Sequence, residues 1–135
     1  MVKLVARDFE QQDNPWNGVT IADEATLTNL LKDSAAKDPF LLELTGDNGF
    51  RLTIGIGGPL GCVQYSSNNG YPPYLVALSE SQDRRNADGD VEFLAGGTAT
   101  PVPLRRCLTF EVLGQIVMYF FATGERSPEV GWEEV

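Results

Sequence analysis

Apolar and polar residues in the first forty positions follow the patterns of one strand and one helix. From Val2 to Phe9, apolar residues alternate with charged ones, which is typical of a strand with one buried face. The turn residues between Asn14 and Gly18 end this strand. Apolar residues then recur at helical spacing, and Asp23 is suited to cap the first turn. The pattern therefore predicts a helix over residues 24–36.

A series of short apolar runs separated by polar turns follows. The runs predict strands over residues 40–44, 50–56, 60–65, 74–78 and 91–94. Strands that follow one another through short polar turns indicate an antiparallel meander. We predict a polar loop from Ser81 to Gly89. We expect irregular structure from Gly96 to Arg106, because Pro101 and Pro103 lack the N–H group that a strand donates to its neighbour.

A second helix is predicted near the carboxyl end. Apolar residues have helical spacing over residues 110–122, Thr109 can cap the start, and Gly124 is placed for a left-handed C-cap. Residues 129–135 could form a last short strand. The sum is one α+β domain over residues 1–135, with a largely antiparallel sheet of about six strands and two helices packed on one face.

Composition agrees with a single globular domain. The chain has 135 residues, of which 42% are apolar and 21% are charged, as is ordinary for globular proteins. A chain of this length can form one core without disulfides or a metal. No apolar run reaches the ~18 residues that a membrane-spanning helix needs, and the first residues lack the pattern of a signal peptide. We expect a cytoplasmic protein without membrane contact.

The side chains that most often perform catalysis or bind metals are scarce. The sequence has no histidine, which is the commonest general base and a common metal ligand. Cys62 and Cys107 are the only cysteines, and their apolar surroundings predict buried, reduced thiols. We therefore expect no catalytic residue, no bound metal and no cofactor.

The charge balance is strongly acidic. The net charge is −9, from 19 acidic and 10 basic residues. Such a protein is repelled by the phosphate backbone, so we expect no direct contact with nucleic acid. A basic partner would be attracted over a long range. The basic residues include two isolated pairs, which we interpret as members of local salt bridges: Arg84 with Arg85, and Arg105 with Arg106.

The passage from Gly55 to Gly61 has some features of a phosphate-binding loop. The third glycine of that motif is displaced by one position, Pro59 interrupts it, and the residues that follow have a strand pattern. A tight turn or bulge between two strands is the better interpretation.

One candidate contact surface is acidic. It carries Asp83, Asp88, Asp90 and Glu92, of which the last three alternate with Gly89 and Val91 and would share one face of a strand. The pattern of a calcium-binding loop is not met, because the later ligands and the glycine are missing. A solvated strand face and an acidic surface for a basic partner both remain open interpretations.

A second candidate contact surface is aromatic. It carries Tyr65, Asn68, Asn69, Tyr71 and Tyr74, around turns that contain glycine and two prolines. Aromatic residues on rigid loops are typical contact residues. At least one of these tyrosines could instead pack back on the sheet, and Trp132 has the same two interpretations.

The order of several short motifs resembles a known family. The motifs are Leu52–Gly58, Gly61–Tyr65, Val91–Phe93 and Pro101–Pro103, followed by the second helix, Ala122–Pro128 and Val130–Glu133. Together they are similar to the immunity proteins of bacterial polymorphic toxin systems, whose toxins usually have the deaminase fold. The resemblance covers roughly residues 40–134.

The resemblance implies a cytoplasmic antitoxin that binds a cognate toxin and blocks its active site or substrate groove. A toxin that deaminates nucleic acid needs a substrate channel and a zinc-activated water. An acidic inhibitor in a basic channel would exclude nucleic acid by shape and by charge. The family signature falls on Gly124, Pro128, Trp132 and Glu133, and the resemblance implies that these four residues preserve the fold.

Two other classes of function are open at this point. The chain could be a general protein-interaction or scaffolding domain that forms a homodimer through a sheet edge, although we favour a monomer. It could also be a small enzyme or ligand-binding domain that uses carboxylates such as those of Asp88, Asp90 and Glu92.

Overall fold

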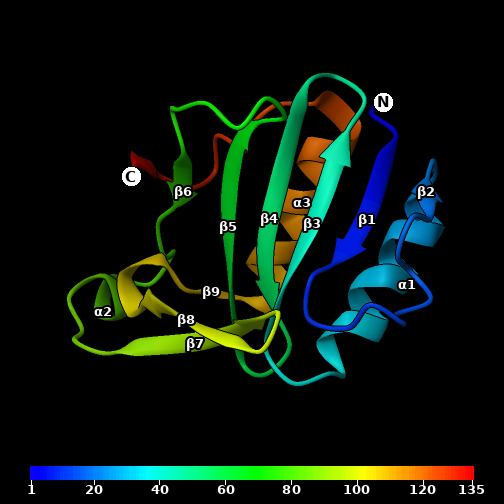
Figure 1. The fold of residues 1–135 in the computed structure, drawn as a ribbon. Coiled ribbons are helices and arrows are strands. Elements are labelled where there is room, and N and C mark those ends of the chain that lie inside the picture. Colours follow the sequence, from blue (N-terminus) through cyan, green and yellow to red (C-terminus); the bar gives the residue numbers. More distant parts are fainter.

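The computed structural model describes residues 1–135 (Figure 1). The strands are β1 (Leu4–Asp8), β2 (Thr20–Ile21), β3 (Phe40–Gly46), β4 (Phe50–Ile56), β5 (Leu60–Ser67), β6 (Leu75–Ala77), β7 (Asp90–Ala95), β8 (Thr98–Pro103), β9 (Leu108–Thr109) and β10 (Trp132–Glu134). The helices are α1 (Glu24–Ala35), α2 (Gln82–Arg85), α3 (Phe110–Thr123) and the 3-10 helix η1 (Leu104–Arg106). The two long helices agree with the predicted ranges to within one residue at each end.

One large sheet organises the molecule. Its main path runs β10-β6-β5-β4-β3-β1-β2, and neighbours along that path are antiparallel. β7 joins β3 through a parallel bridge between Phe40 and Leu94, and it forms an antiparallel hairpin with β8. In Figure 1, α3 lies behind β3, β4 and β5, whereas the β7–β8 hairpin crosses the lower end of the sheet in front. The prediction of a largely antiparallel α+β fold is confirmed.

The core lies between this sheet and the two long helices. It contains 22 buried residues, with alternate positions contributed by β3, β4 and β5. The register places Leu44 beside Leu52 and Leu52 beside Tyr65, so these side chains share the face that the helices cover. α1 adds three buried leucines, and α3 adds five buried apolar residues from one stripe. Each such side chain contributes about 1.5–3 kcal/mol when fully removed from water.

Capping residues fix the ends of the long helices. The carboxylate of Asp23 accepts a hydrogen bond from the backbone N–H of Thr26 at 2.8 Å, which caps the start of α1. The hydroxyl of Thr109 accepts one from Val112 at 3.4 Å at the start of α3. Gly124 ends α3 with a φ of +76°. All three predicted caps are confirmed.

No helix in the structure is both long and apolar enough to cross a membrane.

The sheet has more strands than the six or so expected, and β8 is the main addition. It occupies a stretch that was predicted to be irregular, and it contains both prolines. β8 pairs with β7 alone, with Pro101 opposite Glu92 and Pro103 opposite Asp90. The prediction of irregular structure was wrong because an edge strand has one side without a partner. A proline nitrogen on that side costs no ladder hydrogen bond.

The glycine-rich passage forms the turn between β4 and β5, as predicted. Gly57 and Gly58 have φ values of +94° and +82°. A Cβ on Gly57 would lie 2.5 Å from the carbonyl oxygen of Lys37, so this position needs both a left-handed φ and the lack of a side chain. The turn leads into a strand and not into a helix, which is not the geometry of a phosphate-binding loop.

Candidate functional site

The predicted contact residues fall into two groups at opposite ends of β5 and β6 (Figure 1). The tyrosine loop (residues 68–74) follows the last residue of β5 and carries Asn68, Asn69, Tyr71 and Tyr74. The acidic segment (residues 83–92) includes most of α2 and the start of β7, and carries Asp83, Asp88, Asp90 and Glu92. α2 packs beside η1, and β9, just after η1, pairs with the first residues of β5. The two groups are therefore separated by the length of β5.

Tyr65 is a core residue that is only 8% exposed, so it is no longer a candidate for contact with a partner. Its ring stacks on Phe50 with 5.0 Å between centroids, and it meets Phe120 and Trp132 edge-on at 5.9 and 6.5 Å. Burial raises the pKa of its hydroxyl. Tyr65 is the tyrosine that packs back on the sheet, since its position on β5 faces α3.

Hydrogen bonds hold the tyrosine loop at its base. The side chain of Asn68 donates to the carbonyl of Gly46 at 3.0 Å, and its backbone N–H donates to the carbonyl of Gly49 at 2.9 Å. These two bonds fasten the loop to the turn between β3 and β4. The hydroxyl of Tyr74 donates to the carbonyl of Gly70 at 2.5 Å and so closes the loop on itself. The loop is thereby ordered before any partner binds.

Tyr71 projects from this loop. Its exposed fraction of 71% is the largest of any aromatic residue in the protein. The backbone N–H of Tyr71 donates to the side-chain oxygen of Asn69 at 2.9 Å, which fixes the main chain while the ring stays in solvent. Asn69, Pro72 and Pro73 are exposed beside it. The loop thus presents one large aromatic side chain on a fixed backbone.

The acidic segment presents carboxylates that have no cation partner. Asp83, Asp88, Asp90 and Glu92 are all exposed, and none of them belongs to the four ion pairs of the structure. On β7, Asp90 and Glu92 point outward because Phe93 occupies the opposite face and is completely buried. The alternation seen in the sequence is therefore a solvent-facing acidic edge.

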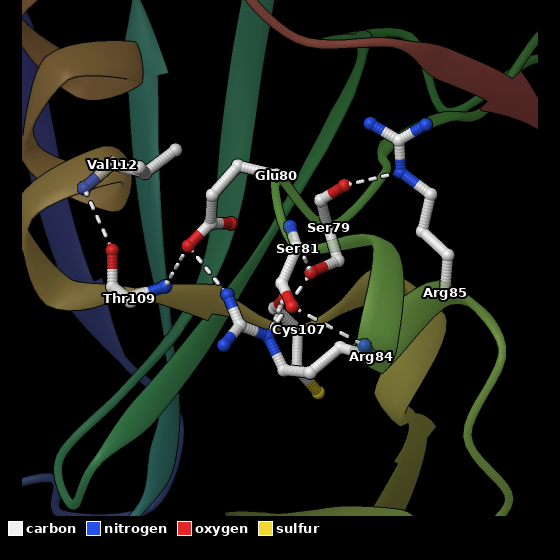
Figure 2. A network of polar contacts seen from close by, with 8 residues as sticks. All are labelled: Ser79, Glu80, Ser81, Arg84, Arg85, Cys107, Thr109 and Val112. Atoms are coloured by element: carbon white, nitrogen blue, oxygen red, sulfur yellow. Dashed lines mark hydrogen bonds and ion pairs between the residues drawn. The ribbon is translucent and has the colours of Figure 1, made fainter.

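A polar network anchors this segment to the body of the protein (Figure 2). The guanidinium of Arg84 pairs with Glu80 at 2.5 Å and donates through Nε to the Ser79 hydroxyl and the Cys107 carbonyl at 3.0 and 3.2 Å. Arg85 donates to the carbonyl of Ser79 at 2.6 Å. α2 is thus held against β9 and the start of α3. Glu80 was not among the predicted residues, although its i,i+4 spacing to Arg84 is typical of an ion pair.

The carboxylate of Glu80 is stabilised in its ionised form. Partial burial acts to raise its pKa, but hydrogen bonds from its own backbone N–H, from that of Thr109 and from Arg84 outweigh this effect. The pKa of Glu80 is lowered as a result. The Thr109 N–H that contacts Glu80, at 3.2 Å, also belongs to the N-cap of α3, so one carboxylate connects both helices.

The second arginine pair forms ion pairs with Glu133. Arg105 and Arg106 contact the two carboxylate oxygens of Glu133 at 2.7 and 2.8 Å. The expected local salt bridges are confirmed for Arg84, Arg105 and Arg106, whereas Arg85 binds a carbonyl instead. Arg84, Arg105 and Arg106 pair with acids outside the acidic segment, so none of them forms an ion pair with its four carboxylates.

The four signature residues have identifiable places in the fold. A Cβ on Gly124 would lie 2.5 Å from the side-chain nitrogen of Asn48, so this glycine is needed for packing as well as for its φ. The indole N–H of Trp132 donates to the carbonyl of Ser127 at 2.9 Å, directly before the exposed Pro128. Glu133 forms the arginine pair described above. This geometry supports the structural role that the family resemblance implied.

The remaining groups with possible chemistry are the surface carboxylates and the two cysteines. No three acidic or cysteine side chains are placed to hold a metal ion together, so Asp88, Asp90 and Glu92 do not form a cation site. Both cysteines are free thiols. Desolvation raises the pKa of Cys62 to about 12 and that of Cys107 to about 11. Both thiols are therefore protonated and weakly nucleophilic at neutral pH.

Comparison with known proteins bears on these surfaces. Residues 5–134 match the family model described as Immunity protein Imm1. No curated protein matches the chain. The family match runs from β1 into β10, so it includes the whole sheet, both long helices and both candidate surfaces. The predicted resemblance to immunity proteins is confirmed, and the chain belongs to the Imm1 family of immunity proteins.

Proposed function

We propose that this protein is an antitoxin that binds a cognate bacterial toxin in the cytoplasm and neutralises it stoichiometrically, without catalysing a reaction. Membership of the Imm1 family over residues 5–134 is the observation that carries the proposal. Binding alone is sufficient for neutralisation, because a protein seated on the active site or substrate groove of the toxin denies access to the substrate.

The proposed partner is a toxin domain of the deaminase fold with a basic groove for nucleic acid. Affinity for nucleic acid comes largely from basic residues that neutralise phosphates. This protein carries a net charge of −9, and the four exposed carboxylates of the acidic segment form no ion pair within the protein. This charge distribution supports a complex in which the acidic segment faces the groove and excludes the substrate by shape and by charge.

The whole chain acts as a single binding domain that is monomeric before it meets the toxin. An exposed sheet edge is the usual route to self-association. The edge of β8 carries Pro101 and Pro103, which cannot donate hydrogen bonds to a second strand. Light scattering of the purified protein should give the mass of one chain, and a mass of two chains would contradict this part of the proposal.

Co-expression tests the function directly. The toxin domain encoded by the neighbouring gene should stop growth when expressed alone in a bacterial host, and this protein should restore growth. The two proteins should also co-purify in equal amounts. An unrelated acidic protein of similar size and charge serves as the control and should not restore growth. Persistent toxicity with both proteins soluble and present would contradict the proposal.

A further inference from the structure

We infer that Tyr71 is an anchor that inserts into an apolar pocket on the toxin, at a contact separate from the acidic segment. The inference rests on the proposed function. It assigns different tasks to the two surfaces: the acidic segment speeds encounter with the toxin, and Tyr71 slows dissociation.

The fixed backbone around Tyr71 is the first argument. Asn68 and Tyr74 each tie the tyrosine loop down through hydrogen bonds to backbone carbonyls, and Asn69 receives the N–H of Tyr71. A side chain on a loop that is already ordered loses little further conformational entropy when it binds. Ordering of the loop backbone would therefore subtract little from the free energy gained by burying the ring.

The exposure of the ring is the second argument. Tyr71 is 71% exposed, whereas Phe9 and Phe50, the next most exposed aromatic residues, are 38% and 37% exposed. Phe9 lies beside the guanidinium of Arg7, and Phe50 stacks on Tyr65. Tyr71 alone among these aromatic residues has most of its ring left to bury. Tyrosine is enriched among the residues that dominate binding energy in interfaces.

The chemistry of the tyrosine side chain indicates what kind of pocket on the toxin would bind it. A buried aromatic side chain covers about 150–250 Å² and usually keeps its hydroxyl hydrogen-bonded. The complementary site on the toxin is therefore an apolar pocket of the width of a phenol ring, with a polar group at its far end. Asn69, Pro72 and Pro73, which are exposed beside Tyr71, would form the rim of the contact.

The distance between the acidic segment and the tyrosine loop is the third argument, because it allows the two surfaces to act at different stages of binding. β5 has eight residues, which at about 3.3 Å per residue extend roughly 26 Å. An interface of ordinary size buries about 800 Å² on each partner, a patch roughly 30 Å across, so one toxin can reach both surfaces. Exposed charges act over a long range and mainly set association rates. A buried aromatic contact acts only after docking and sets the dissociation rate.

Surface plasmon resonance with the immobilised toxin domain tests the inference. Tyr71→Ala should raise the dissociation rate constant by roughly 30-fold or more, the range of interface hot spots, and should leave the association rate within about twofold at low and high salt. Tyr71→Phe should keep most of the slow dissociation, because it retains the ring. The matched control is Phe9→Ala, on the β1 side of the molecule, which should dissociate like the wild type.

The outcomes separate the inference from the proposed function. If the wild type binds and Tyr71→Ala dissociates at the wild-type rate, the anchor does not exist, while the antitoxin function stands. If Tyr71→Ala loses affinity through a slower association rate, the division of tasks between the two surfaces is wrong. If the wild-type protein does not bind the toxin at all, the proposed function itself fails. Thermal unfolding should be unchanged in Tyr71→Ala, since the ring is exposed.

Discussion

Glu133 fastens the last strand to the middle of the chain. It lies on β10, and its two carboxylate oxygens receive the side chains of Arg105 and Arg106. All three side chains are partly shielded from solvent, and Arg106 and Glu133 are less than one-third exposed. Such a shared, charge-assisted arrangement is stronger than a solitary surface pair, although solvent still weakens it.

Replacing Glu133 tests this arrangement. Glu133→Gln keeps the shape but removes the charge, so it should lower the free energy of unfolding by about 1–2 kcal/mol, which is the value for a hydrogen bond to a charged group reduced by solvent screening. The urea midpoint should fall while the slope of the transition stays the same. Glu134→Gln is the matched control, since Glu134 is exposed and has no ion pair. Equal effects in the two variants would contradict the role of Glu133.

Glu80 makes stability depend on pH in a defined direction. Its pKa is lowered from 4.5 in the folded protein, so the folded state favours the ionised carboxylate. The resulting stabilisation is complete above pH 4.5 and is lost as the pH falls through the lowered folded value. The difference in unfolding free energy between wild type and Glu80→Gln should therefore be largest near pH 7 and shrink below pH 4.5. A difference that is constant from pH 7 to pH 3 would rule this account out.

At the residue scale, the sequence predicts partners better than it predicts burial. The two arginine pairs were expected in local salt bridges because an acidic chain offers many carboxylates nearby, and three of the four arginines are found there. The sequence left open which tyrosine packs back on the sheet, because the burial of Tyr65 depends on the register of β5 against β4 and on the position of α3. No local pattern encodes that packing.

At the scale of elements, local signals predict the two long helices well but edge strands and short helices poorly. The predicted polar loop from Ser81 to Gly89 was wrong in part, because Ser81 caps the one-turn helix α2, which is too short to show an apolar stripe. Asp23, Thr109 and Gly124 define the ends of α1 and α3 through contacts within one turn, so their positions can be read from neighbouring residues. β8 depends on whether its prolines face a neighbour or solvent, which is decided by the whole sheet. The strands that were missed are β8 and the two-residue pieces β2 and β9.

Replacing two glycines of the α3 region by alanine should change the stability of the protein in opposite directions. Gly124→Ala places a Cβ at a φ of +76° and 2.5 Å from Asn48, so it should lower stability by at least about 1–2 kcal/mol. Gly114→Ala lies inside α3 with nothing within 4 Å of the new Cβ, so it should raise stability by about 0.5–1 kcal/mol. Urea denaturation of both variants checks the pair. A stabilising Gly124→Ala would contradict the assigned C-cap.

At the scale of the whole molecule, charge is sorted into an internal and an external set. Glu43, Glu80 and Glu133 pair with arginines and hold elements together. The acids of the acidic segment pair with nothing and face solvent. Composition alone predicts the net charge of −9, but not which acids are free. Nor does it predict that the acidic segment and the tyrosine loop lie at opposite ends of β5, since that separation follows from the path of the chain across the sheet.

Relocating the same change in charge tests whether the acidic segment steers association. Asp88→Lys with Glu92→Lys brings the net charge from −9 to −5, and so does Asp13→Lys with Glu24→Lys near α1. The first double variant should associate with the toxin several-fold to about tenfold more slowly at low salt, and the second much less so. The difference in association rate between the two double variants should become smaller as the salt concentration rises, because salt screens exposed charges. Equal rates for the two variants would show that only net charge matters.

The central claim, that this protein neutralises its toxin by occupying it, is tested most directly by titration. Increasing amounts of the purified protein are added to a fixed amount of the cognate toxin domain, and the activity of the toxin, which we propose to be deamination of nucleic acid, is measured. The account predicts that activity falls linearly and reaches zero at one protein per toxin. Full toxin activity in the presence of excess protein would contradict it.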